Sequence, residues 1–300
     1  MKKILGSIGL TLLVLVSLLA LPSTAQATAF TGAGFYYAGG SQTFTGTDYV
    51  RGLSTNAYVA KPFVPNTAVG GVYDHSLIEL AVHETTSGVS GNTVEAGIAV
   101  EPTVFGDFNP HLFGCSWTGG VAGGCWTGGT NWVDNGANAT NLGSDLTADI
   151  GTAKQLQVFW SMTGCGTYNN GWFITYAGTS VGCYTPAAFS AGFQTSKFVQ
   201  AFGEYYYNGA NNAGTSNDKP CGDLGLGGTP GVGQAYVGSL SIVNPSPSTL
   251  TTSFTMFTPT DAPAFDATFA TGSTRTFYYG KAGYKFVGGV ATTPGNAGSC

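Results

Sequence analysis

The chain has 300 residues and a formal net charge of −5, and only 8% of its residues are charged, against roughly 25% in an average domain. No basic stripe is present, so nucleic acid is not expected as a partner. A protein with few ionised carboxylates loses little stability when they are protonated, so the composition predicts tolerance of an acidic medium.

Residues 1–27 have the features of a secretory signal peptide. Two lysines precede an uncharged apolar run from Ile4 to Leu21, and the small-residue motif Ala25-Gln26-Ala27 follows it. An N-terminal membrane anchor is the alternative, because the run is nearly long enough to span a bilayer. Cleavage predicts a secreted, extracellular protein of about 273 residues with no further membrane segment.

Six cysteines remain in the mature chain, an even number typical of disulfides in a secreted protein. The expected nested pairing is Cys115 with Cys125, Cys165 with Cys183, and Cys221 with Cys300. Zinc binding is the rival interpretation, but no pair has C-x-x-C spacing and no histidine follows one closely. We therefore expect no metal and no cofactor.

Short runs of alternating apolar and polar residues, separated by turns rich in glycine and asparagine, recur along the mature chain. They are SLIELAVHE (76–84), TVEAGIAVE (93–101), KQLQVFWSM (154–162), NGWFITYAG (170–178), KFVQAFGEYYY (197–207), AYVGSLSIV (235–243) and TRTFYYGKAGYKFV (274–287). This pattern predicts an all-β sandwich or barrel. No linker or fixed-period repeat marks a boundary, so we expect one domain over residues 70–300, preceded at 28–69 by short strands or a trimmed pro-segment, and a long loop at 209–233.

Familiar catalytic and metal motifs are absent from the sequence: it has no G-x-S-x-G elbow, no H-E-x-x-H and no phosphate loop. His75, Glu79 and His83 share one face of a predicted strand, but four residues of strand span about 13 Å. One ion cannot bridge that separation. We therefore expect histidines that are satisfied by ordinary partners or exposed.

Glu95 is the first candidate catalytic residue. Alternation in TVEAGIAVE places it on the face opposite the apolar residues, next to the small residues Gly97 and Ala99. This predicts a bare sheet surface around the carboxylate, against which another molecule could fit closely.

Glu204 is the second candidate, because it shares its strand face with the aromatic residues Phe202 and Tyr206. Burial and a second carboxyl nearby both raise a carboxyl pKa. Two coupled carboxyls can divide the work of hydrolysis, since one accepts a proton from water and the other donates one. On pattern alone, two exposed strand-edge glutamates are the alternative.

Several segments, in the same order, resemble the neprosin family of glutamic peptidases. The family's run around its first catalytic glutamate is similar to VEAGIAVEPTVFGD, HLF (111–113) and Trp117-Thr118 of this chain. The strand that precedes this run in the family is similar to VYDHSLIELAV. The family's later segments are similar, in order, to NGWFITYAGTSVGCYTPAAF, VQAFGEYYYN, CGDLGLG and GQAYVGSLSIVN. The second of these, VQAFGEYYYN, matches the family's run with the second catalytic glutamate. The similarity covers residues 70 to 245.

The resemblance implies that Glu95 and Glu204 are the catalytic pair of an acid-active endopeptidase with a preference for cleavage after proline. It implies a concanavalin-like sandwich of two antiparallel sheets, with the glutamates on the concave face of one. Analogy with related glutamic peptidases makes Glu204 the base and Glu95 the oxyanion-side acid. Trp117 and Tyr206 are candidates for substrate binding, with core or surface aromatics as the alternative. We expect a monomer that acts on polypeptides.

The sequence also departs from the family pattern. Ile98 stands where the family usually has tryptophan, and Phe202-Gly203 replaces a W-G-G run, so the proline preference is in question. Two other functions remain open. The first is a glycosidase on a similar sandwich, although the paired-acid E-x-D-x-x-E strand of such enzymes is missing. The second is a non-catalytic surface or adhesion protein, which the glycine, asparagine and tyrosine content suggests.

Overall fold

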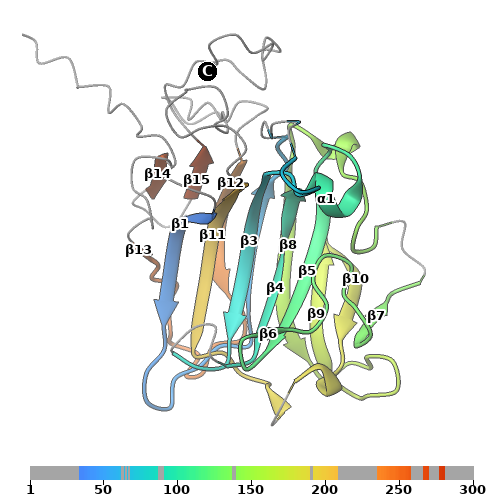
Figure 1. Cartoon of the computed structure of the whole chain (residues 1–300). Helices are drawn as coiled ribbons and strands as arrows, with labels where there is room; N and C mark the ends of the chain where they lie inside the picture. Colours follow the sequence, from blue (N-terminus) through green and yellow to red (C-terminus); the bar gives the residue numbers. More distant parts are fainter. Residues whose placement is uncertain are drawn as a thin grey trace, which may run out of the picture.

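Two antiparallel β-sheets packed face to face form the protein (Figure 1), as the alternating sequence pattern predicts. The structure, a computed structural model, describes residues 34–61, 64, 66, 68–86, 91–136, 140–189, 192–208, 235–257, 266–269 and 277–280. All strand pairings in this part of the chain are antiparallel. The fold class is therefore an all-β sandwich.

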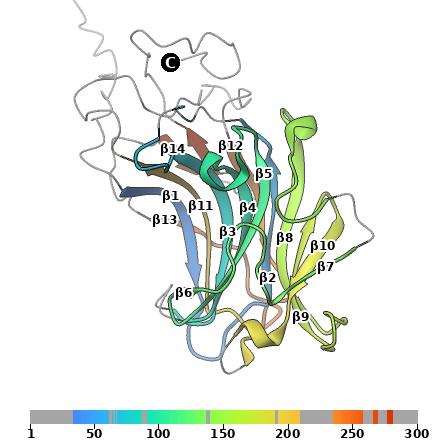
Figure 2. The ribbon, with the colours of Figure 1, turned by 45° about the vertical axis from the view of Figure 1, so that its right-hand side comes forward.

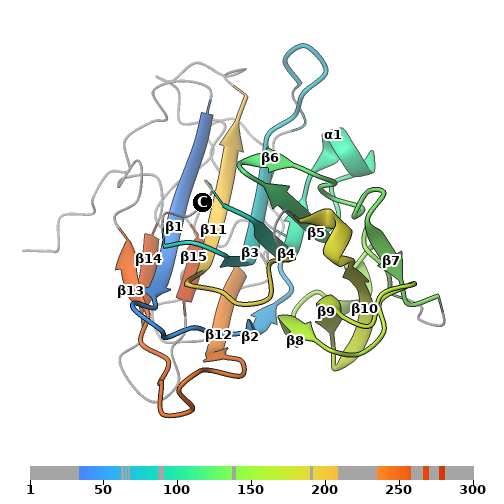
Figure 3. The ribbon, with the colours of Figure 1, turned by 90° about the horizontal axis from the view of Figure 1, so that it is seen from below.

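One sheet has seven strands and the other has eight. The seven-stranded sheet runs in the order β13 (Thr255–Phe257), β1 (Gly34–Thr43), β11 (Phe198–Tyr207), β3 (His75–His83), β4 (Thr93–Val100), β5 (His111–Thr118) and β6 (Val121–Ala122). The eight-stranded sheet runs β14 (Asp266–Phe269), β15 (Phe277–Gly280), β12 (Ala235–Ile242), β2 (Gly52–Tyr58), β8 (Ala153–Ser161), β9 (Gly171–Tyr176), β10 (Thr179–Tyr184) and β7 (Trp132–Asp134). Figures 2 and 3 show the sheets as two layers.

The main core fills the space between the two sheets. From the seven-stranded sheet it takes alternate apolar residues of β3, β4 and β11, namely Ile78, Leu80, Val82, Val94, Ala96, Ile98, Val199 and Ala201. From the other sheet it takes Leu53, Leu156, Val158, Trp160, Trp172 and Ile174, among others. Because side chains alternate along a strand, the intervening residues of β3, β4 and β11 lie on the opposite face, which we call the outer face.

The segment 28–69, expected to hold short strands or a trimmed pro-segment, supplies a strand to each sheet. β1 pairs with β11 over its full length, and β2 lies between β12 and β8. Removal of β2 would divide the eight-stranded sheet. The described sandwich therefore begins before residue 70.

Two of the three expected disulfides are present, Cys115–Cys125 and Cys165–Cys183. The pair Cys221–Cys300, the proposed signal peptide at 1–27 and the long loop at 209–233 lie outside the described residues. Within the described part of the chain, no helix has the length and apolar character needed to cross a membrane. The helices there are short: α1 (Pro102–Phe105) and two 3-10 turns at Thr147–Asp149 and Pro186–Ala188.

Candidate active site

Three glutamates follow a diagonal across three adjacent strands on the outer face. In the strand register, Phe202 of β11 lies opposite Glu79 of β3, and Glu79 lies opposite Gly97 of β4. Glu204 lies two residues beyond Phe202, and Glu95 lies two residues before Gly97. Glu79 is therefore the diagonal neighbour of both, and such neighbours are about 7–8 Å apart. The two predicted catalytic glutamates flank β3, and Glu79 lies between them.

Glu95 is a partly buried carboxyl that is held by a tryptophan. The indole Nε1 of Trp117 donates a hydrogen bond to Glu95 Oε2 over 2.6 Å. Burial raises the pKa of Glu95 to about 8; the Trp117 hydrogen bond opposes the rise, and the charge of Glu204 adds to it. Glu95 is therefore a neutral carboxylic acid in acidic and neutral solution.

Glu204 lies in a different environment because it contacts a histidine. His75 Nε2 is 3.0 Å from Glu204 Oε1, and His75 Nδ1 forms an ion pair with Glu101 Oε2. Burial lowers the pKa of His75, but hydrogen bonds to the two glutamates outweigh it and raise the pKa to about 9. Both ring nitrogens face carboxylate oxygens, so both carry protons. Glu204 is thus paired with an imidazolium cation.

Aromatic rings enclose this imidazolium. The Tyr206 ring stacks on His75 with centroids 5.2 Å apart, and Trp126 meets it edge-on at 5.7 Å. Of the two aromatic residues proposed from the sequence for substrate binding, Tyr206 therefore contacts the partner of Glu204, while Trp117 contacts Glu95.

The start of α1 fixes Glu101. Its side chain caps the helix by accepting a hydrogen bond from the Thr103 backbone amide at 2.8 Å, Pro102 occupies the first helical position, and Gly106 ends the helix in the left-handed region at φ 79°. Proline at the first helical position and glycine just after the last are the residue types that favour a helix at those positions. One carboxylate thus serves as helix cap and as partner of His75.

The region beside Glu95 is not bare, contrary to the expectation from Gly97 and Ala99. A Cβ atom at Gly97 would lie 2.5 Å from Cε1 of Phe113, so the phenylalanine ring occupies the space that the glycine leaves. Phe113 packs with Leu77 and Ala99 in a second hydrophobic cluster on the outer face. The small residues therefore accommodate a neighbouring side chain of the protein itself.

Ile98 faces the main core and is 4% exposed. Its replacement of the family's tryptophan consequently changes the packing between the sheets rather than the outer face that carries Glu95. Phe202, by contrast, lies on the outer face beside Glu79. Of the two departures, Phe202 is the one that adjoins the glutamates.

The disulfide Cys115–Cys125 lies next to Glu95, since Cys115 is directly opposite Glu95 in the sheet. It ties β5 to the glycine-rich segment that follows β6, and Trp126 comes directly after Cys125. Trp126 has φ 73°, a left-handed conformation that is rare for a bulky residue. The cross-link thereby holds Trp126 close to His75.

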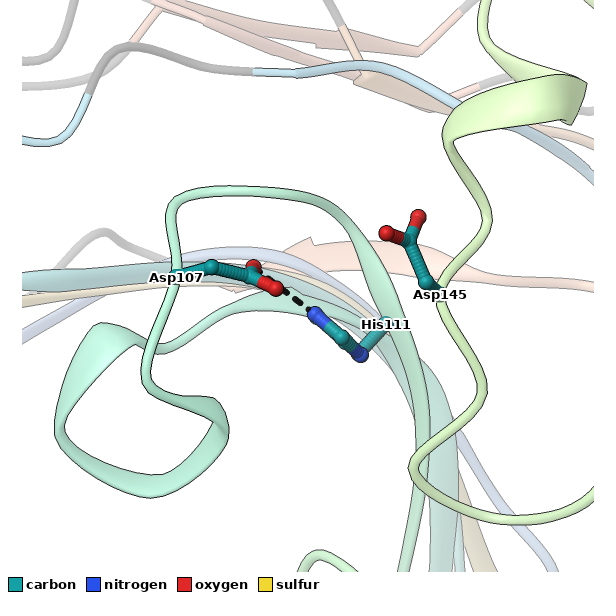
Figure 4. Close-up of side chains that lie close together, drawn as sticks. All are labelled: Asp107, His111 and Asp145. Carbon is teal, nitrogen blue, oxygen red and sulfur yellow. Dashed lines mark hydrogen bonds and ion pairs between the residues drawn. The ribbon is translucent and has the colours of Figure 1, made fainter.

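A separate group at the α1 end of the sheet brings together Asp107, His111 and Asp145 (Figure 4), whose ligand-type atoms lie within 4.8 Å of one another. His111 Nε2 is 2.9 Å from Asp107 Oδ1, and its Nδ1 bonds the carbonyl of Gly143 at 2.9 Å. Asp145 accepts hydrogen bonds from Asn109 and the Thr147 amide. These bonds connect the loop after α1 to the segment around Gly143, a structural role.

His83 is buried and bonded, one of the two outcomes expected for the histidines. Its Nδ1 is 2.9 Å from Thr93 Oγ1, and burial lowers its pKa to about 4. His83 is therefore neutral. It differs in this from His75, which is eight residues earlier on the same strand face.

Sequence reasoning missed three members of the site: His75, Glu79 and Glu101. The sequence places His75 and Glu79 on one strand face too far apart to share a metal ion, and it does not single out Glu101. The sequence signal that could have found the two acids is their position in apolar strand segments of a chain in which only 8% of the residues are charged. In the structure Glu79 and Glu101 are indeed buried, at 5% and 3% exposed.

General acid–base hydrolysis uses one proton-donating and one proton-accepting group. The outer face carries a neutral carboxyl, Glu95, and a carboxylate paired with a cation, Glu204. The model of the neprosin family matches residues 72–281, more than half of the chain. The chain therefore belongs to the neprosin family, as its ordered motifs suggest.

Solved structures show more distant likenesses. Two structures of scytalido-glutamic peptidase, each with a transition state analog, are 9% identical, cover 82% of this chain and 99% of theirs, and have TM-scores of 0.40 and 0.42. Sheep galectin-11 is 12% identical, covers 59% of this chain and 95% of its own, and has a TM-score of 0.28. No curated protein matches the sequence. Because these TM-scores are low, the family assignment rests on the family match.

Proposed function

We propose that the protein is a secreted, acid-active glutamic endopeptidase in which Glu204 is the general base and Glu95 is the neutral acid that stabilises the oxyanion. Its substrate is a polypeptide, and cleavage after proline is the specificity to test first, because the family resemblance implies it. Secretion follows from the predicted signal peptide and agrees with the two disulfides.

The proposed reaction begins at Glu204. Its carboxylate takes a proton from a water molecule, and the water oxygen attacks the carbonyl carbon of the scissile amide. The Glu95 carboxylic acid donates a hydrogen bond to the carbonyl oxygen and stabilises the oxyanion. The C–N bond then breaks as the proton held by Glu204 passes to the leaving amine, which leaves a new carboxyl and a new amino terminus.

One observation carries the assignment of roles: the two glutamates have opposite electrostatic partners. Glu204 is 3.0 Å from the His75 imidazolium, which stabilises a carboxylate, while Glu95 has a pKa of about 8 and an indole donor. A pair of carboxyls whose environments favour different protonation states is suited to acid–base catalysis. The arrangement supports base at Glu204 and acid at Glu95.

The test compares the chain from residue 28 with its Glu95→Gln and Glu204→Gln variants. Each is incubated at pH 3 to 7 with a proline-containing protein and with β-glucans, and the products are identified by mass spectrometry. We expect peptide fragments from the parent and a loss of roughly 10²–10⁴-fold in rate in each variant, the range for an acid or base catalyst.

The matched control is Glu84→Gln, because Glu84 lies just after β3 and bonds Asn92 at 2.8 Å, away from the diagonal of glutamates. This variant should cleave like the parent. Unchanged proteolysis in Glu95→Gln and Glu204→Gln would rule out the pair. Released sugars instead of peptides would establish a glycosidase, and no product from the parent would favour a non-catalytic surface protein.

A further inference from the structure

Glu79 is an acid in a place where a β-sandwich ordinarily has an apolar or well-bonded residue. It is 5% exposed, and its Oε1 has no hydrogen-bond partner among the described residues. Burial raises its pKa well above the usual range, and electrostatic interaction with the neighbouring carboxyls Glu95 and Glu204 raises it further. A buried polar atom without a partner destabilises the folded state, so such an atom calls for an explanation.

The register of the sheet places Glu79 between the two proposed catalytic residues. β3 separates β11, which carries Glu204, from β4, which carries Glu95. Because neighbouring strands are about 4.8 Å apart, the two catalytic strands lie roughly 10 Å from each other. A water molecule and an amide that contact both glutamates must therefore lie over β3.

The other outer-face residues of β3 at this level offer no hydrogen bonds. Leu77 lies opposite Glu204, and Ala81 lies opposite Glu95. Both have apolar side chains, so Glu79 is the polar side chain that β3 presents between them. The titratable groups that face it are Glu204 from β11 and Glu95 from β4.

We propose that Glu79 is a third polar member of the active site, a positioning residue whose neutral carboxyl hydrogen-bonds the attacking water between Glu204 and Glu95. This inference rests on the proposed function. A carboxylic acid both donates and accepts hydrogen bonds, so it can orient a water toward the base without competing for the proton. The role requires an amide-like hydrogen-bonding group and no charge.

The experiment compares Glu79→Gln with Glu79→Leu in the full mature chain. Glutamine retains the shape and hydrogen-bonding groups, and we expect its kcat/KM to stay within about tenfold of the parent. Leucine retains the volume but no polar atom, and we expect kcat/KM to fall at least a hundredfold. The melting temperature of Glu79→Leu should equal or exceed that of the parent, because an unpaired buried polar group has been removed.

The combination of lower activity and undiminished stability distinguishes positioning from packing. If Glu79→Leu does not fold, Glu79→Met replaces it in the comparison, since its flexible side chain adapts to the same space. Parent-like activity in the apolar variant would overturn the inference, and so would an inactive but folded Glu79→Gln. This test can fail separately from the proposed function. An active Glu204→Gln variant would refute the catalytic pair. An inactive Glu204→Gln variant together with an active Glu79→Leu variant would refute only the role of Glu79 in orienting the water.

Discussion

At the scale of single residues, the environment of each carboxyl decides what it can do. Glu95, Glu204 and Glu101 are the same amino acid, yet one is neutral beside an indole, one pairs with His75, and one caps α1 while it bonds the same histidine. The histidine connects the last two. We therefore expect His75 to hold the Glu204 carboxylate in position as the base.

Replacement of His75 by glutamine tests this role. Loss of the imidazolium removes the charged hydrogen-bond donor 3.0 Å from Glu204 Oε1, so kcat/KM should fall by roughly tenfold or more. The constant is measured between pH 3 and 7 on a fluorogenic peptide.

His111→Gln is the control, because it also removes a histidine paired with a carboxylate, but that carboxylate, Asp107, lies in the separate group at the α1 end of the sheet. It should leave kcat/KM close to the parent value. A parent-like kcat/KM in His75→Gln would show that the ion pair contributes only to structure.

Residue-scale predictions from the sequence succeeded where alternation alone decides the outcome. The expected faces of Glu95 and Ile98 follow from period two, and the structure agrees with both. The expectation of a bare surface at Gly97 failed, because the ring that fills it belongs to Phe113 on another strand. The side chain that covers a glycine depends on the register between neighbouring strands, and the local sequence pattern does not specify that register.

At the scale of elements, the sheets depend on strands from the N-terminal part of the chain. β1 shares ten paired positions with β11, the strand that carries Glu204, and β2 lies inside the eight-stranded sheet. A pro-segment that can be removed would have to leave both sheets intact. The segment 34–58 does not meet that condition.

A chain truncated to residues 70–300 should therefore not fold. Loss of β1 and β2 exposes the edge of β11 and removes Leu53 and Ala57 from the core. Circular dichroism in the near ultraviolet and a thermal melt compare it with the chain from residue 28, which should unfold cooperatively. A folded, active 70–300 fragment would show that residues 28–69 are dispensable.

At the scale of the whole molecule, buried proton-binding groups make stability depend on pH. His75 has a pKa of about 9 in the folded state against 6.5 unfolded, so its contribution is complete below pH 6.5 and is lost as the pH rises through 9. Glu95 keeps its proton up to about pH 8 in the folded state but releases it near 4.5 when unfolded, which also favours the folded state at lower pH. Glu79 acts in the same direction.

We accordingly expect the free energy of unfolding to fall between pH 6.5 and 9, by on the order of a few kcal/mol, since each pKa unit corresponds to about 1.4 kcal/mol. His83 opposes this trend only at lower pH, because its pKa of about 4 removes stability as the pH falls from 6.5 through 4. Urea denaturation at intervals of half a pH unit measures the curve. The decline should be smaller in His75→Gln, and stability that rises toward pH 9 would contradict the assignment.

Alternation and motif order are local properties of the chain, so the sequence sufficed to predict the all-β class, the faces of Glu95 and Glu204 and membership of the neprosin family. The paired sheets were needed to show that Glu79 lies between the two glutamates, that His75 joins Glu204 to Glu101, and that β1 and β2 are integral to the sheets. Each of these depends on which strands are neighbours and in what register. Pairing between strands far apart in sequence is set by the packing of the whole sandwich.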